Sequence, residues 1–305
     1  MSIEVTNLTK KYGDQVAVNH ISFQAGKGEI VGFLGPNGAG KSTTMKILTC
    51  FIPPTEGTAK VCGFDIGEKS IEVRKHVGYL PEHNPLYLEM YVKEYLRFAA
   101  ELGKTKNPAQ RVKEVIALTR LESEQHKKIR QLSKGYRQRV GLAQAIIHDP
   151  EVLILDEPTS GLDPNQVIEI RDLIKNLGKE KTIMISTHIM QEVEAICDRV
   201  IIIDKGNIVA DDTLENLRNS AAGKVIIRIQ FAEKMDAEKI KSIPNCDKAT
   251  ETENNTWLLE SADSAFRQQV SQFALKNNYE VLELVSEKNT LEEIFRKLTG
   301  NVGHL

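Results

Sequence analysis

The sequence lacks a long hydrophobic run. None of its apolar stretches approaches the ~18 residues that a membrane-spanning helix requires. The first residues, MSIEVTNLTKK, also lack the apolar core of a secretory signal peptide. We therefore expect a cytoplasmic protein, peripheral on the inner face of the cell membrane only if a partner holds it there.

Closely spaced cysteines, internal repeats and a strong charge imbalance are also absent. The four cysteines, Cys50, Cys62, Cys197 and Cys246, are too scattered for a C-x-x-C metal or redox motif and are expected to be small core residues. The net charge of −2 argues against a nucleic-acid-binding surface over the whole protein, so no nucleic-acid partner is expected. The 305 residues, 41% of them hydrophobic, suffice for two domains with separate cores.

What the sequence does contain is a glycine-rich loop between an apolar strand and a helix. The segment GFLGPNGAGKST (32–43) includes the pattern G-x-x-x-x-G-K-S. Glycines let backbone N–H groups surround a phosphate chain, and the positive end of the following helix points at the same anion. Lys41 would then reach the β- and γ-phosphates, and the Ser42 hydroxyl would bind Mg²⁺. The predicted loop residues are Gly35, Pro36, Asn37, Gly38, Ala39, Gly40, Lys41, Ser42 and Thr43.

The segments around this loop predict an α/β domain over residues 1–220. Residues 3–8 and 16–24 alternate apolar and polar side chains, which indicates antiparallel strands. Helical spacing indicates a helical subdomain over about 86–150. Later apolar runs, typical of buried parallel strands, are VLILD (152–156), TIMIS (182–186) and RVIIID (199–204). With helices expected near 164–177 and 189–197, these segments predict a mostly parallel sheet with an antiparallel β subdomain and a helical insertion.

Residues 221–305 predict a second, smaller α+β domain. The pattern changes near 218–223, and the segments that follow have the order strand, helix, strand, strand, helix, strand. This order matches the ferredoxin-like split unit, and a last helix follows in TLEEIFRKLTG (290–300). We expect this domain to add to a dimer contact.

Two acids and a histidine follow the predicted parallel strands. Asp156 is placed at the carboxyl edge of the sheet to hold the water shell of Mg²⁺, and Glu157 beside it to polarise an attacking water. His188 ends another core strand at the same edge, where it would hold the γ-phosphate and the water in line. Without the glycine loop, these residues would be read as a strand cap and a structural histidine. The loop makes the functional interpretation the favoured one.

A second loop that opens a helix, in LSKGYRQRVGLAQAIIHDP (132–150), predicts that two chains share the nucleotide. A Ser-x-Gly loop at a helix N-terminus is another anion site. One nucleotide in one small core has no evident use for two such sites, whereas two chains facing head to tail would each close on the γ-phosphate held by the other. Nearby basic residues are read as a solvated helix face, namely Lys127, Lys128, Arg130, Lys134, Arg137 and Arg139.

Residues 1 to about 220 resemble the nucleotide-binding subunit of an ABC transporter. Gly35–Thr43 match its Walker A loop, Leu132–Tyr136 its signature loop and Val152–Glu157 its Walker B strand. SGLD at 160–163 resembles the D-loop, and His188 the switch histidine. Tyr12 matches the aromatic residue that stacks on adenine, with Val18 beneath the ring.

The resemblance implies ATP and Mg²⁺ as cofactors. Ser42, Asp156 and the Q-loop residue would bind the metal, and Glu157 would be the catalytic base. The Q-loop position is Glu82 in YLPEHNP, where most of the family has glutamine. A carboxylate still binds Mg²⁺ but adds a negative charge, so whether Glu82 couples as glutamine does stays open.

The signature loop departs from the family pattern in two places. It is LSKGY rather than LSGGQ, so Lys134 and Tyr136 replace a glycine and a glutamine. The resemblance implies that Ser133 and Gly135 contact ATP in trans, with Lys134 between them in the same predicted nucleotide-binding segment, and that Asp163 couples the two sites. The variant loop, Glu82 and the tail all resemble ABC-2 type exporter ATPases, the group of drug-resistance, sodium-export and gliding-motility ATPases.

We therefore expect an ATP-hydrolysing subunit that dimerises with a second ATPase subunit around two ATP molecules and powers export through a separate permease. A helix of that permease is expected in the cleft beside Glu82–Tyr91. A soluble ABC ATPase acting on ribosomes or DNA is disfavoured, because the chain has neither a second fused ATPase domain nor a long coiled coil. A silent regulatory subunit is disfavoured because Lys41, Asp156, Glu157 and His188 are all present. The cargo, and a homodimer against a heterodimer, stay open.

Overall fold

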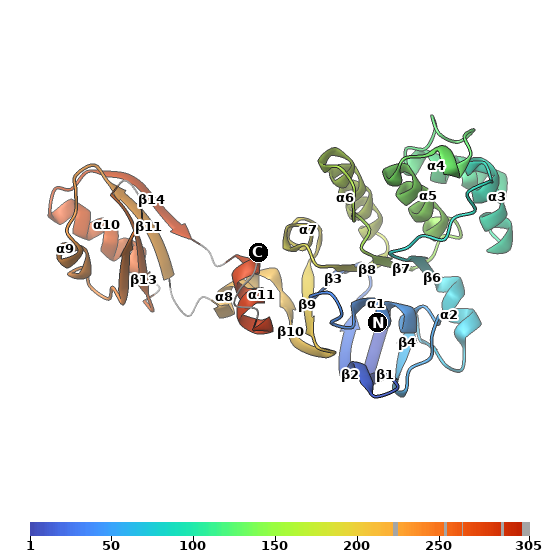
Figure 1. The fold of residues 1–305 in the computed structure, drawn as a ribbon, viewed down its shortest axis with the longest axis horizontal. Helices are drawn as coiled ribbons and strands as arrows, with labels where there is room; N and C mark the ends of the chain where they lie inside the picture. The colour runs from blue at the N-terminus through green and yellow to red at the C-terminus, as the bar shows by residue number, and fades with distance from the viewer. Residues whose placement is uncertain (222–224, 253–254, 264, 288–289, 301–305) are drawn as a thin grey trace. The chain divides into compact units, whose positions relative to one another are not determined.

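The computed structural model describes residues 1–221, 225–252, 255–263, 265–287 and 290–300. The chain divides into two compact units, Met1–Thr213 and Leu214–Leu305 (Figure 1). The second unit therefore begins at the first residue of helix α8 (Leu214–Ala221), earlier in the chain than the boundary expected near residue 220. In the described part of the chain, no helix is both long and apolar enough to cross a membrane.

An antiparallel sheet forms one layer of the first unit. Its order is β2-β1-β4-β5, with β1 (Ile3–Tyr12), β2 (Gln15–Ala25), β4 (Glu56–Val61) and β5 (Phe64–Asp65). Because successive side chains of a strand point to opposite faces, Ile3 and Val5 are buried while Glu4 between them is not. The predicted antiparallel pairing is confirmed, and β1 extends further than expected, to Tyr12.

A mostly parallel sheet forms the centre of the first unit and has the order β10-β9-β3-β8-β7-β6. Its strands are β3 (Ile30–Leu34), β6 (Val77–Leu80), β7 (Val152–Asp156), β8 (Thr182–Thr187), β9 (Arg199–Asp204) and β10 (Asn207–Thr213). Every residue of β3, β7 and β8 is buried, as expected for strands covered on both faces. Only β10 is antiparallel to its neighbour, so the predicted sheet is confirmed.

The helices of the first unit connect these strands. Helix α1 (Lys41–Leu48) follows the glycine loop and packs into one core cluster with residues of both sheets, among them Leu8 and Ile154. The helical subdomain between β6 and β7 consists of α3 (Val92–Leu102), α4 (Pro108–Leu118), a 3-10 turn η1 (Ile129–Gln131) and α5 (Lys134–Ile146). After β7 come α6 (Pro164–Gly178) and, beyond β8, α7 (Met190–Ile196).

Two elements of this unit lack a clear signal in the sequence, α2 (Ser70–His76) and β10. Helix α2 buries only Val73, so it has no repeated apolar spacing. Strand β10 alternates exposed and half-buried residues at the sheet edge and is joined to β9 by a tight turn at Lys205 and Gly206. Both elements are held by neighbouring strands rather than by an apolar face of their own.

The second unit contains an antiparallel sheet of order β12-β13-β11-β14. It consists of β11 (Val225–Phe231), β12 (Lys248–Glu251), β13 (Thr256–Ser261) and β14 (Val281–Glu287), with α9 (Ala237–Lys241) and α10 (Phe266–Lys276) in the connections. Ile240, Trp257 and Val270 belong to one core cluster between helices and sheet. The predicted strand-helix order is confirmed, although α9 is shorter than the 232–243 segment expected. Helix α11 (Leu291–Thr299) packs against α8.

Candidate active site

The glycine loop joins β3 to α1 in a shape that only glycine permits at two points. Gly38 has φ +79° and Gly40 has φ +108°, the left-handed region that side chains rarely adopt. A Cβ on Gly40 would also overlap the carbonyl oxygen of Ala17. The loop therefore reaches α1 without a side chain over its backbone at Gly38 and Gly40, as a phosphate site requires.

Lys41, the first residue of α1, is buried beneath the loop. Its Nζ donates hydrogen bonds to the carbonyl oxygens of Gly35, at 2.7 Å, and Pro36, at 3.2 Å, and lies 4.0 Å from Glu157 Oε1. Burial lowers the pKa of Lys41, and the carboxylates of Glu157 and Asp156 partly oppose that effect. The ammonium group is thus held beside the loop, where negative phosphate oxygens would replace weak carbonyl acceptors.

Side-chain oxygens that could bind a metal lie close together where β7 ends. Ser42 Oγ donates a hydrogen bond to Asp156 Oδ1 at 3.1 Å, and Ser186 in β8 donates to the same oxygen. Asp156 is only 1% exposed, so its carboxylate is fixed behind Ser42. Glu82, in the loop after β6, lines the same pocket. A hydroxyl and two carboxylates are the hard oxygen ligands that Mg²⁺ prefers, so these residues fit the metal.

Glu157 directly follows β7 in an uncommon backbone conformation. Its φ is +49°, and its N–H donates to the Ser186 carbonyl oxygen at 3.0 Å. Both carboxylate oxygens lie 3.0 Å from Nδ1 of His188. Burial raises the pKa of Glu157, while the hydrogen bond from His188 acts in the opposite direction. A carboxylate in such surroundings is a stronger proton acceptor than an exposed glutamate.

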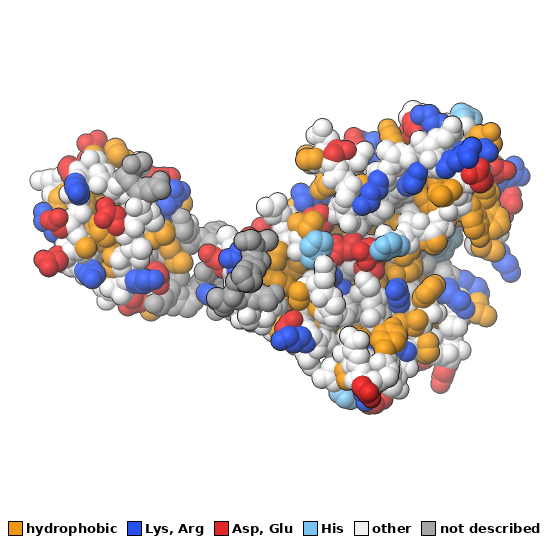
Figure 2. All heavy atoms as spheres, in the orientation of Figure 1, with side chains coloured by type: hydrophobic (Ala, Val, Ile, Leu, Met, Phe, Trp, Pro, Cys, Tyr) orange, Lys and Arg blue, Asp and Glu red, His pale blue; other side chains and the backbone are white. Residues whose placement is uncertain are grey.

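Ten of the predicted residues line one pocket of about 470 Å³. Those that line it are Tyr12, Asn37, Gly38, Gly40, Lys41, Ser42, Thr43, Glu82, Glu157 and His188. Figure 2 shows acidic side chains with histidine beside them over β7 and β8. Gly35, Pro36 and Ala39 belong to the loop but do not line the pocket, and Asp156 lies behind Ser42.

The two residues expected at the adenine ring have different surroundings. Tyr12 ends β1, lines the pocket and is 49% exposed, so its ring is open to a ligand. Val18 is fully buried in the core cluster and does not line the pocket. Its neighbour Ala17 does. The structure therefore gives Val18 no surface for contact with a ring.

Ser133 of the signature loop and Asp163 of the D-loop do not line this pocket, although Ser160 at the start of the D-loop does. Ser133 is exposed and caps α5, where its Oγ accepts a hydrogen bond from the Tyr136 N–H at 3.4 Å. Asp163 is exposed and caps α6 through the Gln166 N–H at 3.0 Å. A Cβ on Gly135 would overlap the Gln166 side chain, so the start of α5 packs closely on α6.

Lys134 extends over the D-loop. A Cβ on Gly161 would overlap Lys134 Nζ, which shows that the lysine lies directly against this glycine. The lysine that replaces the family's glycine thus packs beside the D-loop of its own chain. Its neighbours in the basic cluster mostly pair with acids, Lys128 and Arg130 with Glu89 at 3.3 and 3.2 Å and Arg139 with Glu169.

Four residues of the described site were not predicted from the sequence. Gln15, Ala17 and Ser160 line the pocket, and Ser186 bonds to Asp156. Ser186 lies opposite Asp156 in the β7–β8 pair, so strand pairing would have found it. The spacing of residues within one segment does not indicate this pairing between two strands.

Comparison with known proteins identifies the family. Residues 18–160 match the family described as ABC transporter, and residues 213–299 match the C-terminal domain of DrrA1-3-like ATP-binding proteins. The bacitracin transport ATP-binding protein of Bacillus licheniformis is 33% identical over 98% of this chain and 97% of its own length. A Nod factor export ATP-binding protein I of Cupriavidus metallidurans is 32% identical with the same coverage.

Solved structures support the same assignment. An ATP-binding subunit of an ABC transporter is 30% identical, with a TM-score of 0.67, over 72% of this chain and 93% of that one. A dimeric ATP-binding cassette in a post-hydrolysis state, with ADP and Pi bound, is 25% identical, with a TM-score of 0.65, over 70% and 98%. The resemblance seen in the sequence is confirmed, and the full-length relatives agree with the expected exporter group. The chain belongs to the ABC transporter family, as an ATP-binding ATPase subunit with a DrrA-like C-terminal domain.

Proposed function

We propose that two copies of this chain close on two ATP molecules and that hydrolysis powers export through a separate membrane permease. The observation that carries the proposal is the separation of two anion-binding loops. Lys41 and Ser42 line the pocket, whereas Ser133 and Asp163 are exposed and do not. A second copy placed head to tail would bring its Ser133 to the γ-phosphate end of this pocket. The related dimeric cassette supports this arrangement.

Each pocket residue has a task that its geometry supports. Tyr12 stacks on the adenine, and the loop N–H groups with Lys41 hold the phosphates. Ser42, Asp156 and Glu82 would hold Mg²⁺, which would neutralise phosphate charge. Glu157 takes the proton from the attacking water, because its buried carboxylate has a raised pKa and faces His188.

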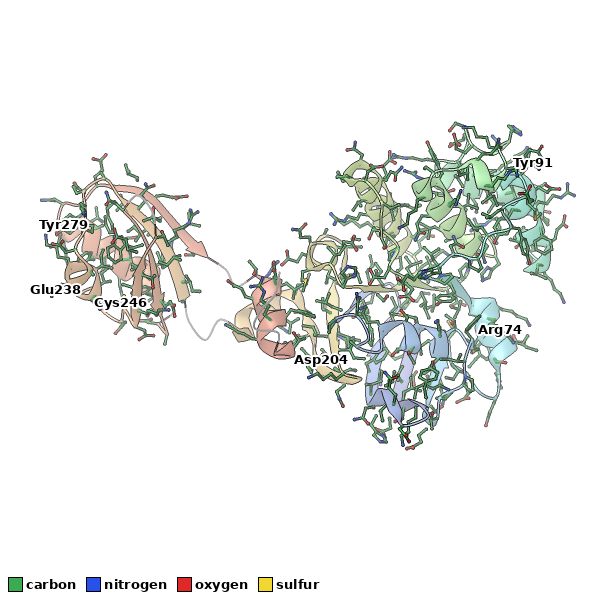
Figure 3. The ribbon with its side chains drawn as sticks, viewed as in Figure 1. Arg74, Tyr91, Asp204, Glu238, Cys246 and Tyr279 are labelled. Carbon is green, nitrogen blue, oxygen red and sulfur yellow. The ribbon has the colours of Figure 1, made fainter. Side chains whose placement is uncertain are left out.

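A separate groove fits the permease. It has a volume of about 1160 Å³, lies between α2, α3 and α5, and includes Pro81 and His83 beside Glu82. Ile71 and Leu102 in its lining are 65% and 74% exposed. Figure 2 shows hydrophobic side chains over α3 and basic ones over α2, where Figure 3 labels Arg74. Because the described lining has basic but no acidic side chains, the occupant is an amphipathic permease helix with acidic residues beside its apolar face.

This docking would place the protein on the inner face of the membrane. Cysteines introduced at Ile71 and Leu102 should crosslink to a cytoplasmic helix of the permease encoded beside this protein. A cysteine at Leu275, which is exposed in the second unit, is the control. Equal crosslinking from all three positions would contradict the groove as the docking site.

Mixing two inactive variants tests the shared site. Glu157→Gln lacks the base and Ser133→Ala lacks the trans hydroxyl, so each homodimer should hydrolyse ATP slowly. A mixed dimer contains one pocket with both changes and one pocket with neither. We therefore expect equimolar mixing to restore part of the wild-type rate. If Ser133 acted within its own chain, both pockets of the mixed dimer would carry one change, and no activity would return.

A further inference from the structure

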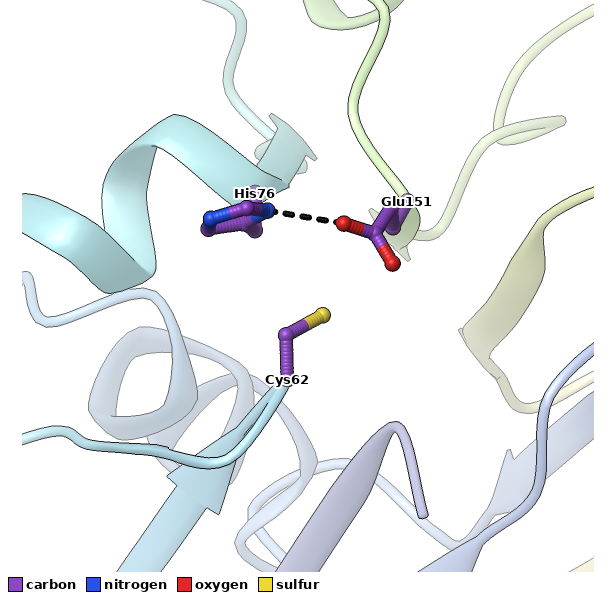
Figure 4. Close-up of side chains that lie close together, drawn as sticks. All are labelled: Cys62, His76 and Glu151. Atoms are coloured by element: carbon purple, nitrogen blue, oxygen red, sulfur yellow. Dashed lines mark hydrogen bonds and ion pairs between the residues drawn. The ribbon is translucent and has the colours of Figure 1, made fainter.

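Three metal-binding residue types meet at the edge of the sheet opposite the candidate active site (Figure 4). Cys62 lies in the turn between β4 and β5, His76 ends α2 just before β6, and Glu151 directly precedes β7. One donor atom from each lies within 4.8 Å of the other two. The nucleotide pocket is at the carboxyl ends of these strands, so the cluster at their amino ends has no part in it.

Two of the three residues, His76 and Cys62, are held by their surroundings. His76 Nδ1 lies 2.9 Å from Glu151 Oε1, and the ring of His76 stacks on Phe64 with centroids 5.2 Å apart. Cys62 has φ +51°, and its N–H donates to the Ser2 carbonyl oxygen at 2.8 Å. His76 and Cys62 are partly buried, whereas Glu151 is exposed and free to adjust. The donors therefore converge on a point that solvent ions can reach.

We propose that Cys62, His76 and Glu151 bind a divalent transition-metal ion of the zinc class. A thiolate, an imidazole and a carboxylate are the usual zinc ligands, with bonds of ~2.0–2.3 Å, and a water would complete the four-coordinate shell. Mg²⁺ and Ca²⁺ prefer oxygen ligands and are poorly matched by sulfur. The thiolate and the carboxylate together balance the two positive charges of the ion.

Binding requires the donor atoms to exchange a proton for the metal. The Cys62 thiol releases its proton to solvent, and the sulfur forms a bond to the ion. His76 binds in its neutral form, and the contact between its Nδ1 and Glu151 is replaced by two bonds to the metal. Because binding releases this proton, affinity falls as the pH is lowered.

A bound ion would link three segments that are distant in the sequence. It would join the β4–β5 turn, the α2–β6 corner and the start of β7. Lys75 and Val77, on either side of His76, line the groove proposed for the permease. The metal would therefore stabilise the wall of that groove without touching ATP, and the proposal does not depend on what the groove binds.

The experiment titrates Co²⁺ into the full-length, untagged chain without nucleotide and with excess Mg²⁺. We expect one equivalent to bind with the near-ultraviolet absorption of a cobalt–thiolate bond, and Zn²⁺ to displace it and raise the unfolding temperature. Cys62→Ser should lose the absorption and the Zn²⁺-dependent shift. Cys50→Ser, at another partly buried cysteine of this unit, should keep both.

Three outcomes would overturn the proposal. They are Co²⁺ binding without thiolate absorption, absorption that persists in Cys62→Ser, or an equal Zn²⁺-dependent shift in wild type and Cys62→Ser. In each case Cys62, His76 and Glu151 do not form the proposed site. ATP affinity of Cys62→Ser, measured in parallel, shows whether the variant is folded. If it is not, His76→Gln provides the same comparison, because loss of the imidazole should also remove the bound equivalent.

Discussion

Two loops of the first unit open helices in the same way but have different surroundings. The loop before α1 is closed by its own chain, since Lys41 is buried beside Asp156 and Glu157 at the end of β7. The loop before α5 ends at Ser133, which is exposed. The start of α6, at Gln166, packs against Gly135 just after it. One loop thus lines a pocket, and the other lies on an open surface.

The difference comes from where each loop lies on the fold. Parallel strands end together at one edge of a sheet, so the first loop is surrounded by polar residues from several strands. The second loop lies on a helix pair that fixes its position, through Arg139 with Glu169 and the Asp163 cap of α6. We therefore expect changes in the first loop's pocket to affect binding or chemistry within one chain, and changes in the second to act only between chains.

The largest expected effect is that of Glu157→Gln. Removing a general base lowers the rate by about 10²–10⁴-fold. Lys41, Ser42 and Tyr12 are untouched, so ATP affinity should be retained and ATP-dependent dimers should accumulate. Phosphate release measures the turnover rate, an ATP-binding titration measures the affinity, and light scattering measures the accumulation of dimers. Turnover near the wild-type rate would remove Glu157 from the role of base.

A smaller effect is expected from Ser133→Ala. A hydrogen bond to a charged group contributes about 1.5–3 kcal/mol, so turnover should fall about 10- to 100-fold. ATP affinity of the dilute monomer should not change, because Ser133 does not line its pocket. Ser70→Ala, at the start of α2, is the matched control. Weaker ATP binding by the Ser133→Ala monomer would show that the two loops are not separate.

Tyr12→Ala should weaken ATP binding by the monomer about tenfold, because stacking of a base on an aromatic ring contributes about 1–3 kcal/mol. Tyr12→Phe keeps the ring and should bind almost as tightly as wild type. GTP affinity should fall in parallel, since stacking does not distinguish the bases. An unchanged ATP affinity in Tyr12→Ala would place the adenine elsewhere, and equilibrium fluorescence titration measures each value.

The smallest effect concerns stability. Burial raises the pKa of Glu157 above 4.5 in the folded protein, so folding disfavours the charged form, and stability is lost as pH rises through the folded-state pKa. Glu157→Gln should therefore unfold a few degrees higher than wild type at pH 7.5, at about 2–4 °C per kcal/mol. The difference should shrink as pH falls towards 4.5. Thermal unfolding without nucleotide measures it, and a difference independent of pH would point to another cause.

Local patterns predicted the residues that act within one segment. The spacing from Gly35 to Ser42, and the two acids Asp156 and Glu157 after the apolar residues 152–155, are visible without a structure because each lies in continuous sequence. The ferredoxin-like order of the tail follows in the same way. Helix α2 could not be predicted from a local pattern, because it buries only one residue. The role of Ser186 could not be predicted either, because its hydrogen bond to Asp156 joins segments 30 residues apart.

Sequence alone predicts the chemical groups of the candidate site: a glycine loop of phosphate-binding pattern, acids and a histidine at strand ends, and a second loop that opens a helix. Only the tertiary structure decided which of these residues share a pocket. It placed Val18 in the core and Ala17 in the lining, left Ser133 outside, and brought Cys62, His76 and Glu151 together. The reason is physical: side-chain chemistry belongs to each residue, whereas burial and proximity arise from packing between segments that are distant in the chain.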